Sequence, residues 1–133
     1  MRSHLEFRSA ELFDSSLTSG MPGGENVAKL LSEKLTDEGY RVESVAPEDW
    51  GWRVQLSNAR FPLWVGCGHY PEYSDGFLCF IEPSKTYVRR WFRRVSTEQE
   101  VERLAASLER IFGDCGLVSN LRWWTDDEVA AST

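Results

Sequence analysis

The chain has 133 residues, of which 41% are hydrophobic and 27% charged, and a formal net charge of −6. This length predicts one domain over residues 1–133 with one hydrophobic core. The negative charge disfavours a general nucleic-acid binder, which normally carries a basic surface. Three cysteines without CxxC spacing, and no apolar run long enough to span a bilayer, favour a cytoplasmic location and no membrane partner.

The first third of the chain predicts a strand, a loop and a helix. Residues 5–7 alternate with polar neighbours, as in a short strand, and residues 1–3 are expected to be frayed. Residues 14–24 are rich in Ser and Gly and predict a loop. From Glu25 the spacing changes to one helical face, and Gly39 is placed to end that helix. That face carries Val27, Leu30, Leu31 and Leu35.

The middle of the chain predicts an antiparallel meander. Residues 40–45 resemble a strand that ends at a turn over residues 47–49. Alternating apolar residues then predict strands at 50–56, 63–69 and 77–81, joined by short connections. Successive strands with short links pair antiparallel.

The last third contains one ambiguous segment. Residues 87–95 fit a strand no better than a helix, and we predict a short helix in which Trp91 and Phe92 anchor the segment to the body. Two overlapping capping boxes begin at Ser96 and Thr97 and predict a long amphipathic helix. Leu121 and Trp123 suggest a last strand, and residues 126–133 are expected to be frayed.

These elements define an α+β fold. We predict a two-layer sandwich, in which an antiparallel sheet of five to six strands has the two main helices packed on one face. The order along the chain is β-α-β-β-β-β-(α)-α-β.

The simplest hairpin registers predict which residues share a face of the sheet. Cys67 then lies opposite Cys79, and Gly66 and Gly68 lie on the same face as Trp50 and Trp52. A glycine within a strand marks a bulge or a close approach. Either aromatic rings cover the glycines, or an aromatic-walled groove is open there for a ligand or a partner. Both faces of the sheet are apolar on this register, so the second face needs a cover.

Two segments contain residue types that can support chemistry. Cys67, His69 and Cys79 supply three of the four ligands of a structural zinc, but buried thiols and a strand-end imidazole explain them as well. The same thiol and imidazole diverge rather than converge as a nucleophile pair. The glycine-rich residues 20–24 lack the Lys-Ser/Thr of a phosphate-binding loop. We therefore predict no catalytic, cofactor-binding or metal-binding residue.

The segment from Lys85 to Arg94 is the strongest local anomaly. It holds five of the fifteen basic residues and no acid, so the rest of the chain carries −11. Arginines interleaved with aromatic residues are able to stack on bases. We consider three roles for these arginines, in order of preference. They form a solvated face paired with neighbouring acids, or they contact a protein partner, or they contact nucleic acid.

Three short motifs resemble a pattern in small uncharacterised bacterial single-domain proteins. They are Pro47-Glu48-Asp49-Trp50-Gly51-Trp52, then Leu63-Trp64-Val65-Gly66-Cys67-Gly68, and Phe80-Ile81-Glu82-Pro83. The ending Leu121-Arg122-Trp123-Trp124 is similar to the ends of those proteins. That group includes immunity proteins that neutralise polymorphic toxins, so the resemblance implies a small binding module.

These observations favour a non-enzymatic protein-binding domain, of the immunity or inhibitor type, that blocks a basic target protein. The alternative is a small-molecule-binding domain or enzyme with an aromatic pocket around Trp50, Trp52, Cys67 and His69. The candidate contact residues are Trp50, Trp52, Trp64, Gly66, Gly68, His69, Arg89, Arg90, Arg93 and Arg94.

Overall fold

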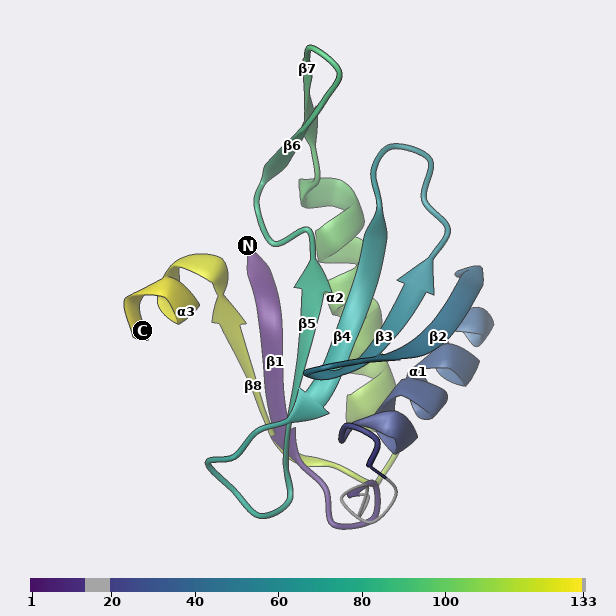
Figure 1. Ribbon diagram of the computed structural model, residues 1–133, viewed down its shortest axis with the longest axis vertical. Helices are drawn as coiled ribbons and strands as arrows, with labels where there is room; N and C mark the ends of the chain where they lie inside the picture. Colours follow the sequence, from purple (N-terminus) through teal and green to yellow (C-terminus); the bar gives the residue numbers. More distant parts are fainter. Residues whose placement is uncertain (14–19, 133) are drawn as a thin grey trace.

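The computed structural model describes residues 1–13 and 20–132, and these form two layers (Figure 1). Helices α1 (Glu25–Asp37) and α2 (Glu98–Asp114) cover one face of an antiparallel sheet. The sheet order is β2-β3-β4-β5-β1-β8, which confirms the predicted α+β architecture. Its strands are β1 (Arg2–Arg8), β2 (Val42–Glu48), β3 (Gly51–Leu56), β4 (Leu63–His69), β5 (Gly76–Glu82) and β8 (Ser119–Thr125).

The core lies between the sheet and the two helices. Alternate residues of the central strands point into it, because strand side chains alternate between faces. Helix α1 ends at Asp37. Two residues later, Gly39 adopts a φ of 94°, a left-handed value that favours glycine. Fully buried side chains from both layers meet there: Leu5, Phe7, Leu31, Leu35, Val54, Val65, Phe77, Ile81, Leu104, Leu108 and Phe112.

The register of the β4–β5 hairpin is confirmed, whereas that of β3–β4 differs from the prediction by one residue. Cys67 pairs with Cys79, but Trp52 pairs with Cys67 rather than with Gly66. The connection between β3 and β4 is a six-residue loop, 57–62, in which the Asn58 side chain donates to the Phe61 carbonyl at 3.0 Å. The predicted register places the centre of the turn at residue 59, which requires a loop with an odd number of residues. The observed loop has an even number of residues, so the pairing of β3 with β4 shifts by one residue. Such a shift exchanges the two faces of a strand.

This shift moves Trp52 to the helix side of the sheet. Its side chain is 8% exposed, and its indole nitrogen donates to the Pro22 carbonyl at 3.0 Å. Gly66 lies on the other face, opposite Phe80. The predicted sharing of one face by Trp52 and the two glycines, Gly66 and Gly68, is therefore wrong.

The segment predicted as a short helix is a two-stranded ribbon. Strands β6 (Tyr87–Arg90) and β7 (Arg93–Ser96) form a separate small sheet that projects from one end of the molecule (Figure 1). A helix needs a body surface along one side to bury Trp91 and Phe92, and both side chains are instead exposed. We call residues 87–96 the hairpin.

The boundaries near the chain ends and in β2 also differ from the prediction. Strand β2 extends through Pro47 to Glu48, which is possible because an edge strand tolerates proline. Strand β1 begins at Arg2, and residues expected to be frayed form helix α3 (Asp126–Ser132) beside β1 and β8. Of the predicted loop 14–24, residues 14–19 lie outside the described residues. Among the described helices, none has the length and apolarity needed to cross a membrane.

Candidate functional site

Each of the two faces of the hairpin carries one pair of arginines that lie opposite each other. Tyr87, Arg89 and Arg94 share one face, whereas the pair Val88 and Val95 shares the other with Arg90 and Arg93. Arg89 pairs with Arg94, and Arg90 pairs with Arg93. Like charges directly opposite each other destabilise a strand pair. The ribbon therefore carries an electrostatic cost on both faces.

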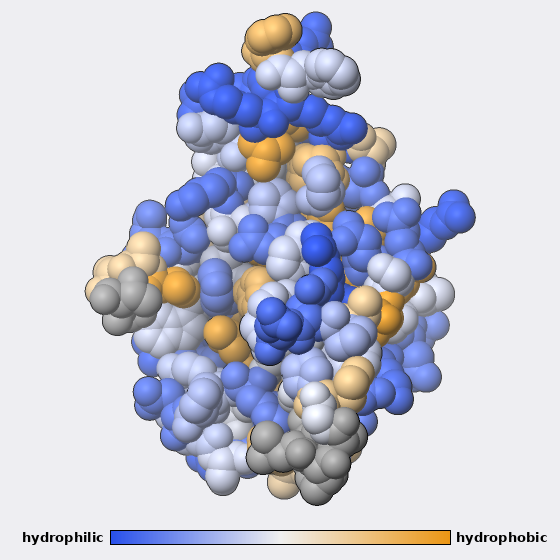
Figure 2. All heavy atoms as spheres, viewed as in Figure 1, coloured by the Kyte–Doolittle hydropathy of each residue, from blue (hydrophilic) through white to orange (hydrophobic). Residues whose placement is uncertain are grey.

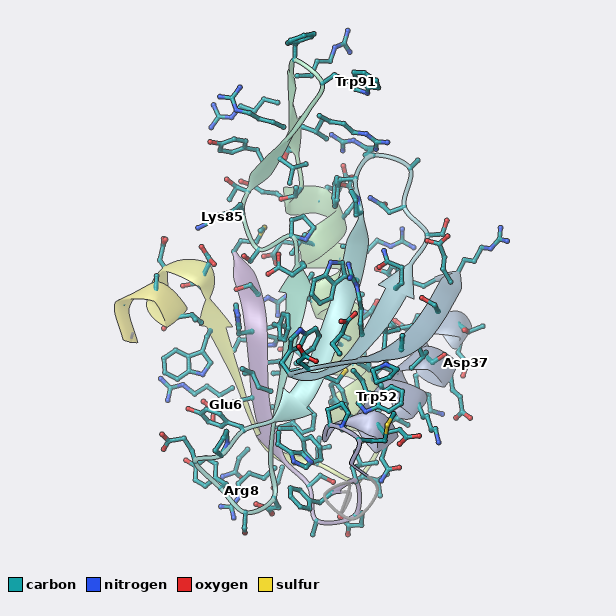
Figure 3. All side chains as sticks on the ribbon, in the orientation of Figure 1. Glu6, Arg8, Asp37, Trp52, Lys85 and Trp91 are labelled. Atoms are coloured by element: carbon teal, nitrogen blue, oxygen red, sulfur yellow. The ribbon has the colours of Figure 1, made fainter. Side chains whose placement is uncertain are left out.

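The tip of the hairpin consists of two aromatic residues. Trp91 is 90% exposed and Phe92 is 102% exposed. Trp91 has a φ of 60°, a left-handed conformation that is rare for a bulky side chain. Figure 3 shows Trp91 at the outer end of the ribbon, remote from Lys85 at its root. No packing in the described structure accounts for either side chain.

Two of the four arginines are held within the molecule. The Arg94 guanidinium lies 3.6 Å from the centre of the Tyr87 ring, a cation–π contact. Arg90 donates hydrogen bonds to the carbonyl oxygens of Ala59 and Arg60, at 3.2 and 2.8 Å. Arg89 and Arg93 have no acidic partner among the described residues.

The root of the hairpin is attached to the body at several points. Val88 and Val95 pack against the core, and the Thr97 hydroxyl donates to the carbonyl of Lys85. The Lys85 ammonium bonds to Asp126 of α3 at 2.6 Å, and this hydrogen bond lowers the pKa of the Asp126 carboxyl. Helix α3 therefore holds the connection that leads into the hairpin.

A second brace joins the hairpin to α2 through the β3–β4 loop. Arg90 bonds to the loop carbonyls, and Arg60 in that loop forms an ion pair with Glu100 at 2.8 Å. The ribbon is thus tied to α3 at its base and to the β3–β4 loop at Arg90, the last residue of β6. The two tip residues lie beyond these contacts and are exposed.

Acidic residues surround this root. Glu98 and Glu100 begin α2 directly after β7, and Asp126 and Asp127 begin α3 beside Lys85. We call these four residues the acidic collar. Figure 2 shows the upper end of the molecule as largely hydrophilic, with a hydrophobic group at its outermost point. The charge therefore changes sign along the projection, from the acidic collar at the root to the arginines of the ribbon below the tip.

The sheet face without α1 and α2 covers itself with aromatic rings. Trp50 stacks on Trp64 at 5.8 Å, and Phe80 lies 5.0 Å from Trp50. A Cβ atom added to Gly66 would lie 2.3 Å from Cζ of Phe80. The ring of Phe80 therefore occupies the space above the glycine. Of the two interpretations, the structure supports rings over glycine rather than an open groove.

Of the four residues proposed for a small-molecule pocket, three share the helix side of the sheet and one does not. Trp50 lies on the open face, while Trp52 and Cys67 lie on the helix side. His69 stacks on Phe13 at 4.3 Å and lies against Gly23. The Sγ atoms of Cys67 and Cys79 are buried and 3.8 Å apart, and burial raises the pKa of the Cys79 thiol.

Five hollows lie elsewhere on the described surface, and three of them are mainly polar. The other two are mainly apolar, and one of these is lined by His4, Tyr70, Leu78, Trp124 and Val129. One of the five hollows, at a loop junction, has a volume of about 550 Å³, and the other four have volumes of about 160–230 Å³. The lining of the 550 Å³ hollow consists of Gly20, Met21, Pro22, Pro47, Glu48 and Asp49, and none of these is aromatic. Among the described residues no group of three or more His, Cys, Asp or Glu is placed to hold a metal.

The exposed tip is the feature that sequence reasoning missed. A signal for it was present, because residues 88–95 read Val-Arg-Arg-Trp-Phe-Arg-Arg-Val, the same forwards and backwards apart from the central pair. A sequence mirrored about two residues matches a hairpin with a two-residue turn. The absence of Gly or Asn at that turn conceals the signal.

No family model matches the sequence, and the searches of curated proteins and of solved structures found no significant match.

Proposed function

We propose that this chain is a non-enzymatic protein-binding domain that contacts its partner through the hairpin. The observation that carries the proposal is the pair of solvent-exposed aromatic side chains, Trp91 and Phe92, at the end of a braced projection. Tryptophan and arginine are the residues that contribute most often to the binding energy of protein interfaces. Monomeric proteins seldom leave two adjacent aromatic side chains this exposed without a use.

The bracing supports a binding role because it reduces the entropy lost on association. Lys85 and Thr97 fix the root of the ribbon, and Arg90 fixes its outer end to the β3–β4 loop. A ligand element already held in its bound conformation loses less freedom when it docks. An inhibitor or immunity-type protein acts by filling a partner's working cleft, and a narrow rigid projection has the shape for that role. Three free cysteines support the cytoplasm as the place of action.

The proposal is tested by affinity capture from the native cell with three immobilised versions of the full chain. The versions are the wild type, Trp91→Gly with Phe92→Ser, and the control Leu121→Ser, which changes an apolar residue that is 38% exposed elsewhere. We expect a protein that is retained by the wild type and the control and lost from the hairpin variant. Identical protein sets on all three would contradict the proposal. An inhibitor role further requires that the wild type lowers the activity of the captured protein.

A further inference from the structure

The hairpin, if it is the contact proposed above, also specifies the chemistry of the surface that receives it. Its two guanidinium groups without an internal partner among the described residues lie on opposite faces of the ribbon, because Arg89 faces one way and Arg93 the other. A flat acidic surface engages only one face. A cleft with carboxylates on both walls engages both, and it removes the repulsion between the facing arginines.

The tip and the collar add two further requirements. Trp91 and Phe92 reach furthest and need an apolar floor to be buried. Glu98 and Asp127 lie at the root, where they meet the rim of the cleft, and neither has a basic partner among the described residues. We propose that the hairpin enters a cleft on a partner protein that has an apolar floor, acidic walls and a basic rim.

Dimensions argue against duplex nucleic acid as the receiving surface. Each strand of the ribbon has four residues, so it reaches about 14 Å. The major groove, which admits a two-stranded ribbon, is about 8.5 Å deep. Full insertion leaves roughly 5 Å between the collar and the phosphates, which is less than the screening length of about 8 Å at physiological salt. The collar is then repelled, and the same repulsion acts against an anionic lipid surface.

The first experiment identifies what the tip touches. The photoreactive analogue benzoylphenylalanine replaces Trp91 in the full chain expressed in its native cell, and a second version carries it at Leu121. We expect position 91 to crosslink to a protein at an apolar segment that forms the floor of a cleft with Asp and Glu on its walls. Crosslinks from position 91 to nucleic acid or lipid, or to a protein site with no acidic residues around it, would overturn the inference.

The second experiment uses charge reversal and the crosslinked partner in purified form. Arg89→Glu with Arg93→Glu is expected to weaken binding by about tenfold or more, and Glu98→Lys by about two- to fivefold. The control Glu33→Lys changes an exposed acid on α1 and should alter affinity less than about twofold. Thermal melting checks that each variant is folded, and Glu98→Gln replaces Glu98→Lys should the latter fail.

The sign of the collar effect separates the candidate partners. A basic rim predicts weaker binding of Glu98→Lys, whereas a polyanion predicts stronger binding of the same variant. Stronger binding of Glu98→Lys to the crosslinked partner would therefore reject the basic rim. If position 91 crosslinks to no protein, the proposed function itself fails. If it crosslinks to a protein but the charge effects are absent, only the acidic cleft is rejected.

Discussion

Gly66 lies directly beneath an aromatic ring, and this contact predicts the effect of a side chain there. Gly66→Val places a Cβ 2.3 Å from Cζ of Phe80, so the ring must move. We expect a loss of about 1–3 kcal/mol in the free energy of unfolding, although valine favours strands. Urea unfolding measures it. Gly113→Ala in α2 is the control, because nothing lies within 4 Å of its added Cβ, and it should stabilise by about 0.5–1 kcal/mol. Equal effects of the two changes would contradict the contact.

Trp91 combines an unfavourable backbone conformation with an unburied side chain. Glycine adopts the φ of 60° without strain, and the 90% exposed indole contributes little packing. Trp91→Gly should therefore leave the free energy of unfolding unchanged or raise it by up to about 1 kcal/mol. The same change should abolish partner capture. A clear loss of stability in urea unfolding would show that the indole packs on the body.

His4 predicts a pH dependence of stability. Burial lowers the pKa of its imidazole below the ordinary 6.5, and the nearby Asp126 carboxylate opposes this in part. The unfolded chain then binds more protons as the pH falls below 6.5, so stability present above this value is lost as the pH falls through the folded pKa. His4→Phe keeps an aromatic ring against Phe80 and removes this titration. Urea unfolding of the variant should show a flatter profile between about pH 7 and 5. Equal slopes would contradict the shift.

At the scale of elements, the hairpin is an appendage that the core does not need. Within it, Val88 and Val95 are the residues that pack against the core. Replacing residues 89–94 by Asn-Gly keeps this pair and closes it with a favoured two-residue turn. We expect the free energy of unfolding to change by less than about 1 kcal/mol, as measured by urea unfolding. A chain that no longer folds would show that the Arg90 brace supports the β3–β4 loop.

At the scale of the whole molecule, charge is segregated. The window Lys85–Arg94 carries +5 and the remainder −11. We expect no measurable binding of a random single-stranded oligonucleotide at physiological salt, because the body repels a polyanion. Fluorescence anisotropy tests this with the wild type and with Arg89→Ala plus Arg93→Ala. Micromolar, salt-sensitive binding that the double variant loses would reverse our order of partner classes.

The sequence by itself determined the elements whose signals are local. Both long helices follow from one apolar face each, and Gly39 marks the end of α1. Thr97 is the N-cap residue of α2, but its hydroxyl donates to the Lys85 carbonyl and the predicted capping box does not form. The pairing of Cys67 with Cys79 follows from the short connection between β4 and β5. The α+β class follows from these elements, because two amphipathic helices and an apolar sheet bury their faces against each other.

The tertiary structure alone decided the positions that depend on loop length and on surroundings. The length of the β3–β4 loop placed Trp52 in the core, because a register shift of one residue exchanges the two faces of a strand. Trp50 lies in the turn before β3 and packs on Trp64 at the open face. Residues 87–95 suit either a helix or a ribbon by pattern, and the absence of a body beside them decided for the ribbon. The exposure of a side chain depends on what surrounds it in the folded chain. The sequence therefore singled out Trp91 and Phe92, but it predicted that they pack against the body, whereas both are exposed.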